Sequence, residues 1–178
     1  SYVQMPAVAV GGAVSAMVAQ NIGANKWHRV SRIVWSGIGI NLLMSGVLIL
    51  LMTLFAQPLL GLFLPAQSPA IDIAIHINHI IGWTFILMGV SVVVSFAVRA
   101  NGAVIVPLLI LIISAIIVRF SVGFGLYGQF GAEAIWAAFI ATAMTSCILS
   151  IGYYVHGGWK KAKAMPNMGG PIIPAAPE

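Results

Sequence analysis

Residues 104–127 read VIVPLLILIISAIIVRFSVGFGLY, a stretch in which Arg119 is the single charged side chain. A helix that rises ~1.5 Å per residue needs ~20 apolar residues to cross a hydrocarbon layer of ~30 Å. Inside lipid, a spanning segment has to pair its own backbone N–H and C=O groups, which an α-helix does. The stretch therefore predicts a transmembrane helix.

Four more apolar stretches of similar length lie at residues 3–22, 30–55, 75–97 and 134–154. The mean hydropathy of the 178-residue chain is +1.06, and only 6% of its residues are charged. Soluble domains carry about 25% charged residues, because their surfaces face water. We predict an all-α, polytopic membrane bundle of five transmembrane helices over residues 1–159, followed by a disordered cytoplasmic tail at 160–178.

Basic residues concentrate in alternate connections between these stretches. Short loops rich in Lys and Arg stay on the cytoplasmic side of a membrane. The other two connections carry Asp72 and Glu133 and no basic residue. We predict that the N-terminus lies outside and the C-terminus in the cytoplasm of a multi-pass protein of the cell (plasma or inner) membrane. The basic residues behind this prediction are Lys26, Arg29, Arg32, Arg99, Lys160, Lys161 and Lys163.

Nucleic-acid binding, catalysis and metal binding find little support in the sequence. The net charge of +5 is explained by topology, and no basic surface is long enough to follow a phosphate backbone, so we expect no nucleic-acid partner. We find no nucleophile with a base in reach and expect no enzyme, no catalytic residue and no metal site. Asp72, His76 and His79 share a helix face and could bind a metal or sense pH, but a solvated position at the membrane interface explains them better.

A mildly polar stripe runs along the predicted helix at 75–97. Hydroxyls, a flexible thioether and an amide suit a cavity for amphiphilic cations, and they equally suit hydrogen bonds between packed helices. The residues of this substrate-cavity candidate are Thr84, Met88, Ser91 and Ser95, with Gln4 and Ser15 facing them from the first helix.

Two further features concern single side chains. Arg119 lies a little past the middle of its span, where an arginine costs ~2.5–3.5 kcal/mol on insertion scales; it either anchors the helix or takes part in transport. Trp27, Trp83 and Trp159 fall near the ends of predicted helices. Such positions are typical of aromatic rings at a membrane interface.

Three short motifs lie near the ends of the predicted helices: QNIGA at 20–24, RANG at 99–102 followed by Pro107, and GAEAIW at 131–136. They resemble the Q-x-x-G-A helix ending, the R-x-x-G-x-x-x-x-P loop and the G-x-x-G-[IV]-W helix entry of the multidrug and toxic compound extrusion (MATE) family of transporters. Arg119 falls where that family often has an arginine. The family-motif positions are Gln20, Gly23, Ala24, Arg99, Gly102, Pro107, Arg119, Gly131 and Trp136.

The resemblance implies a twelve-helix antiporter that exchanges H⁺ or Na⁺ for organic cations and other xenobiotics by alternating access. This chain would supply the last five helices, as a fragment of the C-terminal lobe whose partners are the lipid bilayer and a missing N-terminal lobe. Some relatives carry an acidic residue where this chain has Met88, so we expect the coupling-ion site outside the chain and no cofactor. A lipid-linked sugar flippase of the same superfamily and a non-transporting assembly subunit remain alternatives.

Overall fold

The computed structural model describes residues 4–61 and 70–161, and within them the chain is helical with no strand. The first, second and third elements are α1 (Met5–Gly23), α2 (Trp27–Leu54) and the short α3 (Ala56–Gly61). They are followed by α4 (Ala70–Arg99), α5 (Ile105–Ile112), the π-helical η2 (Ile113–Val118), α6 (Arg119–Phe130), α7 (Glu133–His156) and the 3₁₀ turn η3 (Gly158–Lys161).

Five helices are long and apolar enough to cross a membrane, which confirms the predicted all-α polytopic bundle. The fourth of them combines α5, η2 and α6 and runs from Ile105 to Phe130. It exposes most of its apolar side chains, as expected for a helix whose solvent is lipid. The predicted tail at 160–178 lies outside the described residues except for Lys160 and Lys161, which belong to η3.

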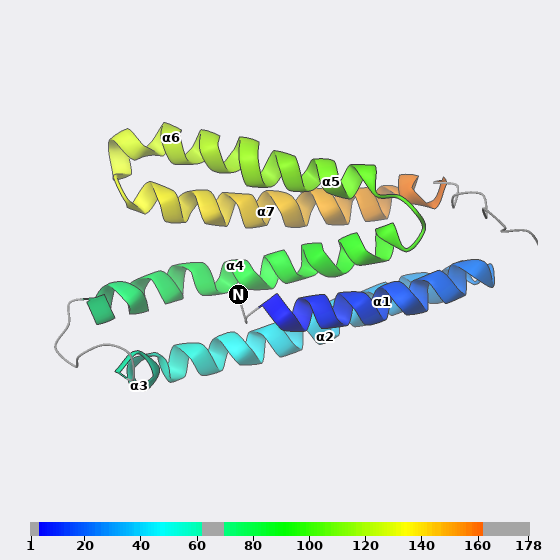
Figure 1. Cartoon of the computed structure of the whole chain (residues 1–178), viewed down its shortest axis with the longest axis horizontal. Helices are drawn as coiled ribbons and strands as arrows, with labels where there is room; N and C mark the ends of the chain where they lie inside the picture. Colours follow the sequence, from blue (N-terminus) through cyan, green and yellow to red (C-terminus); the bar gives the residue numbers. More distant parts are fainter. Residues whose placement is uncertain (1–3, 62–69, 162–178) are drawn as a thin grey trace, which may run out of the picture.

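The helix α4 lies at the centre of the bundle and packs against α1 and α2 on one side and α7 on the other (Figure 1). The helix α6 then covers α7 from the far side. The core between these helices consists largely of valines with almost no exposed surface, including Val14, Val18, Val34, Val93 and Val94. β-branched side chains of this size fill the narrow space between closely packed backbones.

Glycines set how closely the helices approach. A Cβ on Gly37 of α2 would collide with Val14 of α1, and one on Gly89 of α4 would lie 2.6 Å from the amide nitrogen of Asn41. Small residues at helix contacts are the usual means of association in lipid, where apolar burial adds little. The packing of α1 and α4 on α2 therefore depends on these two positions.

The fourth span is not a uniform α-helix. The π-helical turn η2 interrupts it at Ile113–Val118, although the sequence pattern predicts one continuous α-helix. Ser114 in this turn is buried and donates its hydroxyl to the carbonyl of Ile110 at 2.5 Å. Serine side chains that bond back to the preceding turn loosen helix geometry, and π turns of this kind often occur at functional sites. Arg119 follows η2 directly.

The α1–α2 turn, the α4–α5 turn and the end of α7 lie at one end of the bundle, and the α6–α7 turn lies at the other (Figure 1). The basic connections predicted to share one side of the membrane are therefore neighbours in space.

Trp159 corrects one sequence expectation at this end. Its side chain is fully buried instead of lying at the lipid interface. The indole stacks on Tyr154 at 5.3 Å between ring centroids, meets Trp27 edge-on at 6.0 Å, and donates its N–H to the carbonyl of Tyr154 at 2.9 Å. The side-chain amide of Asn101 donates to the carbonyl of Trp159 at 2.9 Å. The turn after α7 is thus fastened to α2 and to the α4–α5 turn.

Candidate functional site

A cavity of about 260 Å³ opens beside α4 and brings together three of the predicted substrate-cavity residues. We call it the α4 cavity. Met88, Ser91 and Ser95 lie on its wall together with Ser146 of α7. The other lining residues are Val8 of α1, Val92, Phe96 and Arg99 of α4, and Pro107, Ile110 and Leu111 of α5.

Met88 lies half-buried on the wall of this cavity, at the middle of α4. The side-chain amide of Gln4, at the start of α1, donates to its sulfur at 3.7 Å. The predicted approach of Gln4 to the stripe is therefore present. A thioether is polarisable and adapts its rotamer to the shape of a ligand, so Met88 suits a surface that binds varied apolar compounds.

Ser91 links α4 to α7 as well as lining the cavity. Its hydroxyl oxygen lies 2.8 Å from the hydroxyl oxygens of both Ser146 and Ser150, and it donates to the carbonyl of Ser146 at 3.2 Å. A hydroxyl that already has these partners holds helices together. Of the two roles considered for the stripe, a cavity surface or hydrogen bonds between packed helices, Ser91 therefore has the second as well as the first.

Thr84 and Ser15 are not among the residues that line the α4 cavity. Thr84 is buried one turn before Met88, and its hydroxyl donates to the carbonyl of Ile81 at 2.6 Å. Ser15 is half-buried on α1. The stripe predicted on one face of α4 is therefore divided between a cavity wall and a packed interface, because α4 has neighbours on several sides.

The predictions from the sequence did not include Ser146 and Ser150 as partners of Ser91. The two are four residues apart, so they share one face of α7, and this spacing could have indicated that both contact the same neighbour.

Asn41 of α2 is also fully buried, and its amide nitrogen has no hydrogen-bond partner among the described residues. It accepts a hydrogen bond from Ser45 at 3.4 Å and lies against Gly89, the residue after Met88.

Several motif residues build turns. Gly102 adopts φ +79° in the α4–α5 turn, and its N–H donates to the carbonyl of Arg99 at 2.9 Å. Gly131 adopts φ +56° at the end of α6. Both conformations strain most residues with a Cβ, so glycine is favoured there. Pro107 is buried in the first turn of α5, where its missing N–H is not needed.

The remaining motif residues occupy less constrained positions. In the first motif, the carbonyl of Gln20 accepts the N–H of Ala24 at 3.1 Å as α1 ends, and Gly23 has open space around it. Arg99 is exposed at the end of α4. Trp136 is half-buried on α7, with its ring centroid 6.4 Å from that of Phe139.

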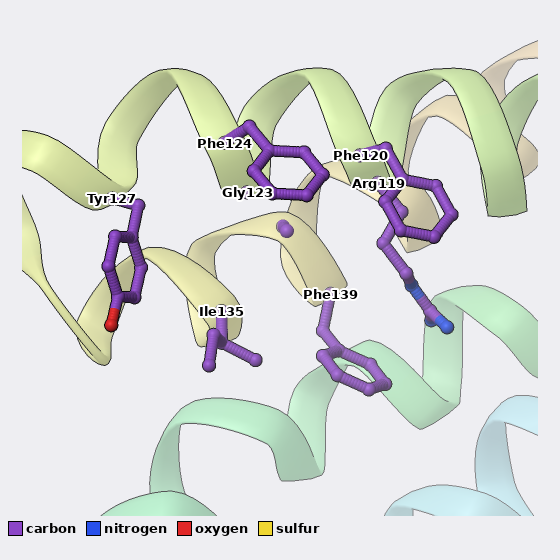
Figure 2. A pocket seen from close by; sticks show the side chains of 8 residues that line it. Arg119, Phe120, Gly123, Phe124, Tyr127, Ile135 and Phe139 are labelled. Atoms are coloured by element: carbon purple, nitrogen blue, oxygen red, sulfur yellow. The ribbon is translucent and has the colours of Figure 1, made fainter.

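Arg119 extends from the start of α6 to the ring of Phe139 on α7 (Figure 2). Its guanidinium carbon lies 4.1 Å from the ring centroid. A guanidinium over an aromatic face is stabilised by about 0.5–2 kcal/mol, more where water is excluded. The contact supports an anchoring role, and the Nε atom of Arg119 is buried without a hydrogen-bond partner among the described residues.

A carboxylate and an imidazole lie close together near the α6–α7 turn. The Nε2 atom of His76 lies 3.4 Å from a carboxylate oxygen of Glu133, and both side chains are 60% exposed. His79 is also exposed, and the side chain of Asp72 lies outside the described residues. Over residues 4–61 and 70–161, no group of three His, Cys, Asp or Glu side chains could hold a metal ion.

Comparison with known proteins places these features in a family context. The family model described as MatE matches residues 1–124. The chain is 38% identical over 163 residues to "Probable multidrug resistance protein YoeA" of Bacillus subtilis, an alignment that covers 90% of this chain and 35% of that protein. It is 25% identical over 159 residues to "Probable multidrug resistance protein NorM" of Thermotoga maritima, covering 88% of this chain and 34% of that protein. The chain thus spans about a third of the length of these relatives, and no solved structure matches it.

Proposed function

This chain belongs to the MatE family, and from that membership we propose that it forms most of the C-terminal lobe of a multidrug efflux antiporter. The observation that carries the proposal is the α4 cavity, which runs along the second half of a membrane-spanning helix, from Met88 to Arg99, and combines a thioether, hydroxyls, apolar side chains and one arginine. The names of the two curated relatives support the same activity. A transporter, and not an enzyme, is the class of protein that this cavity fits.

The α4 cavity would bind organic cations and related xenobiotics through dispersion and weak polar contacts. Met88 would adapt to different ring systems, and the hydroxyl of Ser95 would accept or donate a single hydrogen bond. Few directional groups mean little discrimination, which is what a multidrug site requires. Alternating access would then come from movement of this lobe against the N-terminal lobe of the same protein.

The driving ion, H⁺ or Na⁺, would act on carboxylates outside this chain. The acidic residues of the sequence are Asp72, Glu133 and Glu178, and none lies near the middle of a span. Glu133 is the first residue of α7 and is exposed. A carboxylate that couples transport has to lose its water during the cycle, and Glu133 is exposed in the described bundle.

We further propose that the end of the bundle with Lys26, Arg99 and Lys161 faces the cytoplasm. Single cysteines at these three positions, in a Cys147→Ala background, should be protected from an impermeant maleimide added to intact cells. A cysteine at Gln129, which is exposed in the last turn of α6, should be labelled. Labelling from outside at Arg99 and protection at Gln129 would reverse the orientation.

A chimera tests the efflux function. The segment of the Bacillus subtilis relative that aligns with this chain would be replaced by this chain, and export of several fluorescent organic cations from cells would be followed. We expect export that an ionophore abolishes. A chimera that reaches the membrane at the parent's level, and exports none of the compounds that the parent exports, would contradict the proposal.

The same chimera tests the role of Met88. Met88→Ala removes dispersion contacts at a cavity wall, so we expect export of bulky cations to fall several-fold, export of small ones to change little, and the protein level to stay constant. Met144→Ala on α7, whose side chain is 48% exposed outside the cavity, is the matched control. If export of every compound fell equally, and in proportion to the protein level, Met88 would be a packing residue and not part of a binding site.

A further inference from the structure

A pocket of about 320 Å³ lies between the start of α2 and the end of α7, and we call it the α2–α7 pocket. Its surface is both polar and apolar, and it shares no lining residue with the α4 cavity. The volume lies within the range of sites for small ligands. The lining residues that bear on its chemistry are Trp27, Ser31 and Trp35 of α2, Tyr154 and Val155 of α7, and Lys160 of η3.

The aromatic wall of this pocket is held in place by ring contacts. The indole of Trp159 has no exposed surface, stacks on Tyr154 and meets Trp27 edge-on. Trp35 meets Tyr154 edge-on as well, with 6.4 Å between ring centroids. Trp35 nevertheless keeps 49% of its surface exposed, so its ring is available to a molecule outside the bundle. A wall that is ordered before binding lowers the entropic cost of binding.

Two exposed polar side chains supply hydrogen-bond donors to the pocket. They are the hydroxyl of Ser31 and the ammonium of Lys160. The stem of Lys160 lies over Gly157, since a Cβ added to Gly157 would be 3.9 Å from the Cδ atom of Lys160 and 4.0 Å from its Cε atom. The stem therefore rests on the end of α7, and the charged group remains accessible to solvent or lipid.

Lys160 lies at an end of the bundle that has positive charge without acidic side chains. The described part of the chain contains two acidic residues, Asp72 and Glu133, near the starts of α4 and α7. Both helices start at the opposite end of the bundle (Figure 1). The end with Lys160 also carries the exposed Lys26 and Arg29. The electrostatic potential at this end therefore favours an anionic ligand.

The polar and apolar parts of the pocket lie at different depths. Lys160 follows the end of α7, whereas Trp35 lies ~12 Å along α2 from Trp27 at ~1.5 Å per residue. A phospholipid holds its phosphate at the membrane surface and its acyl chains deeper, which is the same order. A free phosphate ion would occupy the polar part alone and leave the ring of Trp35 unused. The arrangement therefore favours a lipid over a soluble anion.

We propose that the α2–α7 pocket binds the headgroup of one anionic glycerophospholipid from the leaflet at this end of the bundle. The phosphate oxygens would accept hydrogen bonds from the ammonium of Lys160 and the hydroxyl of Ser31. The glycerol and one acyl chain would lie along Trp35 and Val155, which is 68% exposed. Basic pockets between membrane helices recognise anionic headgroups in this way. The cation of a zwitterionic headgroup would be repelled by Lys160, so phosphatidylcholine should bind less well.

Native mass spectrometry of the purified 178-residue chain in detergent tests this site. The chain is titrated with phosphatidylglycerol or with phosphatidylcholine of the same acyl chains, and the fraction of protein with one bound lipid is measured. We expect phosphatidylglycerol to bind at one saturable site at least fivefold more tightly than phosphatidylcholine. Lys160→Gln should reduce its affinity to that of phosphatidylcholine, and Lys160→Arg should retain most of it. Lys161→Gln removes an exposed lysine that does not line the pocket, so this matched control should keep the preference.

A second variant tests the apolar part of the pocket. Trp35→Ala removes a half-exposed ring without opening a packed core, and it should weaken phosphatidylglycerol binding several-fold. Trp83→Ala removes a ring that is 69% exposed and does not line the pocket. This control should bind phosphatidylglycerol as the parent chain does. Unchanged binding in a folded Trp35→Ala variant would overturn the proposal.

Three other results would overturn it. The first is equal affinity for the two lipids, or an equal loss of phosphatidylglycerol binding in Lys160→Gln and Lys161→Gln. The second is displacement of the lipid by inorganic phosphate at the same concentration, which would identify a site for free phosphate. The third is a Lys160→Gln variant that unfolds at a lower temperature without lipid but binds phosphatidylglycerol normally, because Lys160 would then only stabilise the end of α7. Binding is measured without transport, so failure here leaves the efflux proposal standing, and the reverse also holds.

Discussion

Trp159→Ala is expected to destabilise the folded bundle by about 3–5 kcal/mol, the range for truncation of a buried tryptophan. The indole has no exposed surface, stacks on Tyr154 and contacts Trp27. Its removal leaves a cavity between α2 and the end of α7, and it leaves the carbonyl of Tyr154 without its N–H donor. The measurement is thermal unfolding of the purified protein in detergent, followed by size-exclusion chromatography of the soluble fraction.

Trp83→Ala is the matched control for this experiment. Trp83 belongs to α4 but is 69% exposed, so its truncation opens no cavity and should change the stability of the bundle little. Equal losses in the two variants would mean that Trp159 lies at the membrane interface, as its place near a helix end first indicated. A loss of stability in Trp159→Ala alone would support the packing of Trp159 inside this end of the bundle.

Gly37→Ala is expected to destabilise the bundle by about 1–3 kcal/mol, the usual cost of overpacking a core. The added methyl group would collide with Val14 of α1 and lie 3.5 Å from Val93 of α4. Both valines have almost no exposed surface and a stiff χ1 angle. Relief of the collision therefore requires α1 and α2 to separate. The free energy of unfolding in a mixed-micelle denaturation series would report the change.

Gly39→Ala, two residues further along the same helix, provides the opposite expectation. A Cβ at Gly39 has no heavy atom within 4 Å, and alanine is favoured over glycine in a helix by up to about 1 kcal/mol. Gly39→Ala should therefore be neutral or stabilising. If both alanine variants unfolded alike, the close approach of α1 and α2 at Gly37 would be wrong.

The transmembrane helices and their order could be predicted from the sequence, and its motifs indicated the family. Length and hydropathy suffice for the first two, because lipid leaves a spanning chain no alternative to pairing its own backbone groups. Two motif glycines, Gly102 and Gly131, lie in turns, where a positive φ admits few other residues. Three motifs near helix ends were enough to indicate the family that the family model over residues 1–124 then showed. Residue order and spacing carry information of this kind directly.

Which face of each helix packs against protein could not be predicted and is seen only in the folded bundle. Several features depend on helix rotation and on neighbours that are distant in sequence. They are the division of the α4 stripe between the α4 cavity and the hydrogen bonds of Ser91, the burial of Trp159, the difference between Gly37 and Gly39, and the position of Arg119 over Phe139. In a soluble protein an apolar stripe would indicate the buried face. Here the lipid-facing side is as apolar as the core, so hydropathy does not distinguish them, and close packing of particular side chains selects the contact faces.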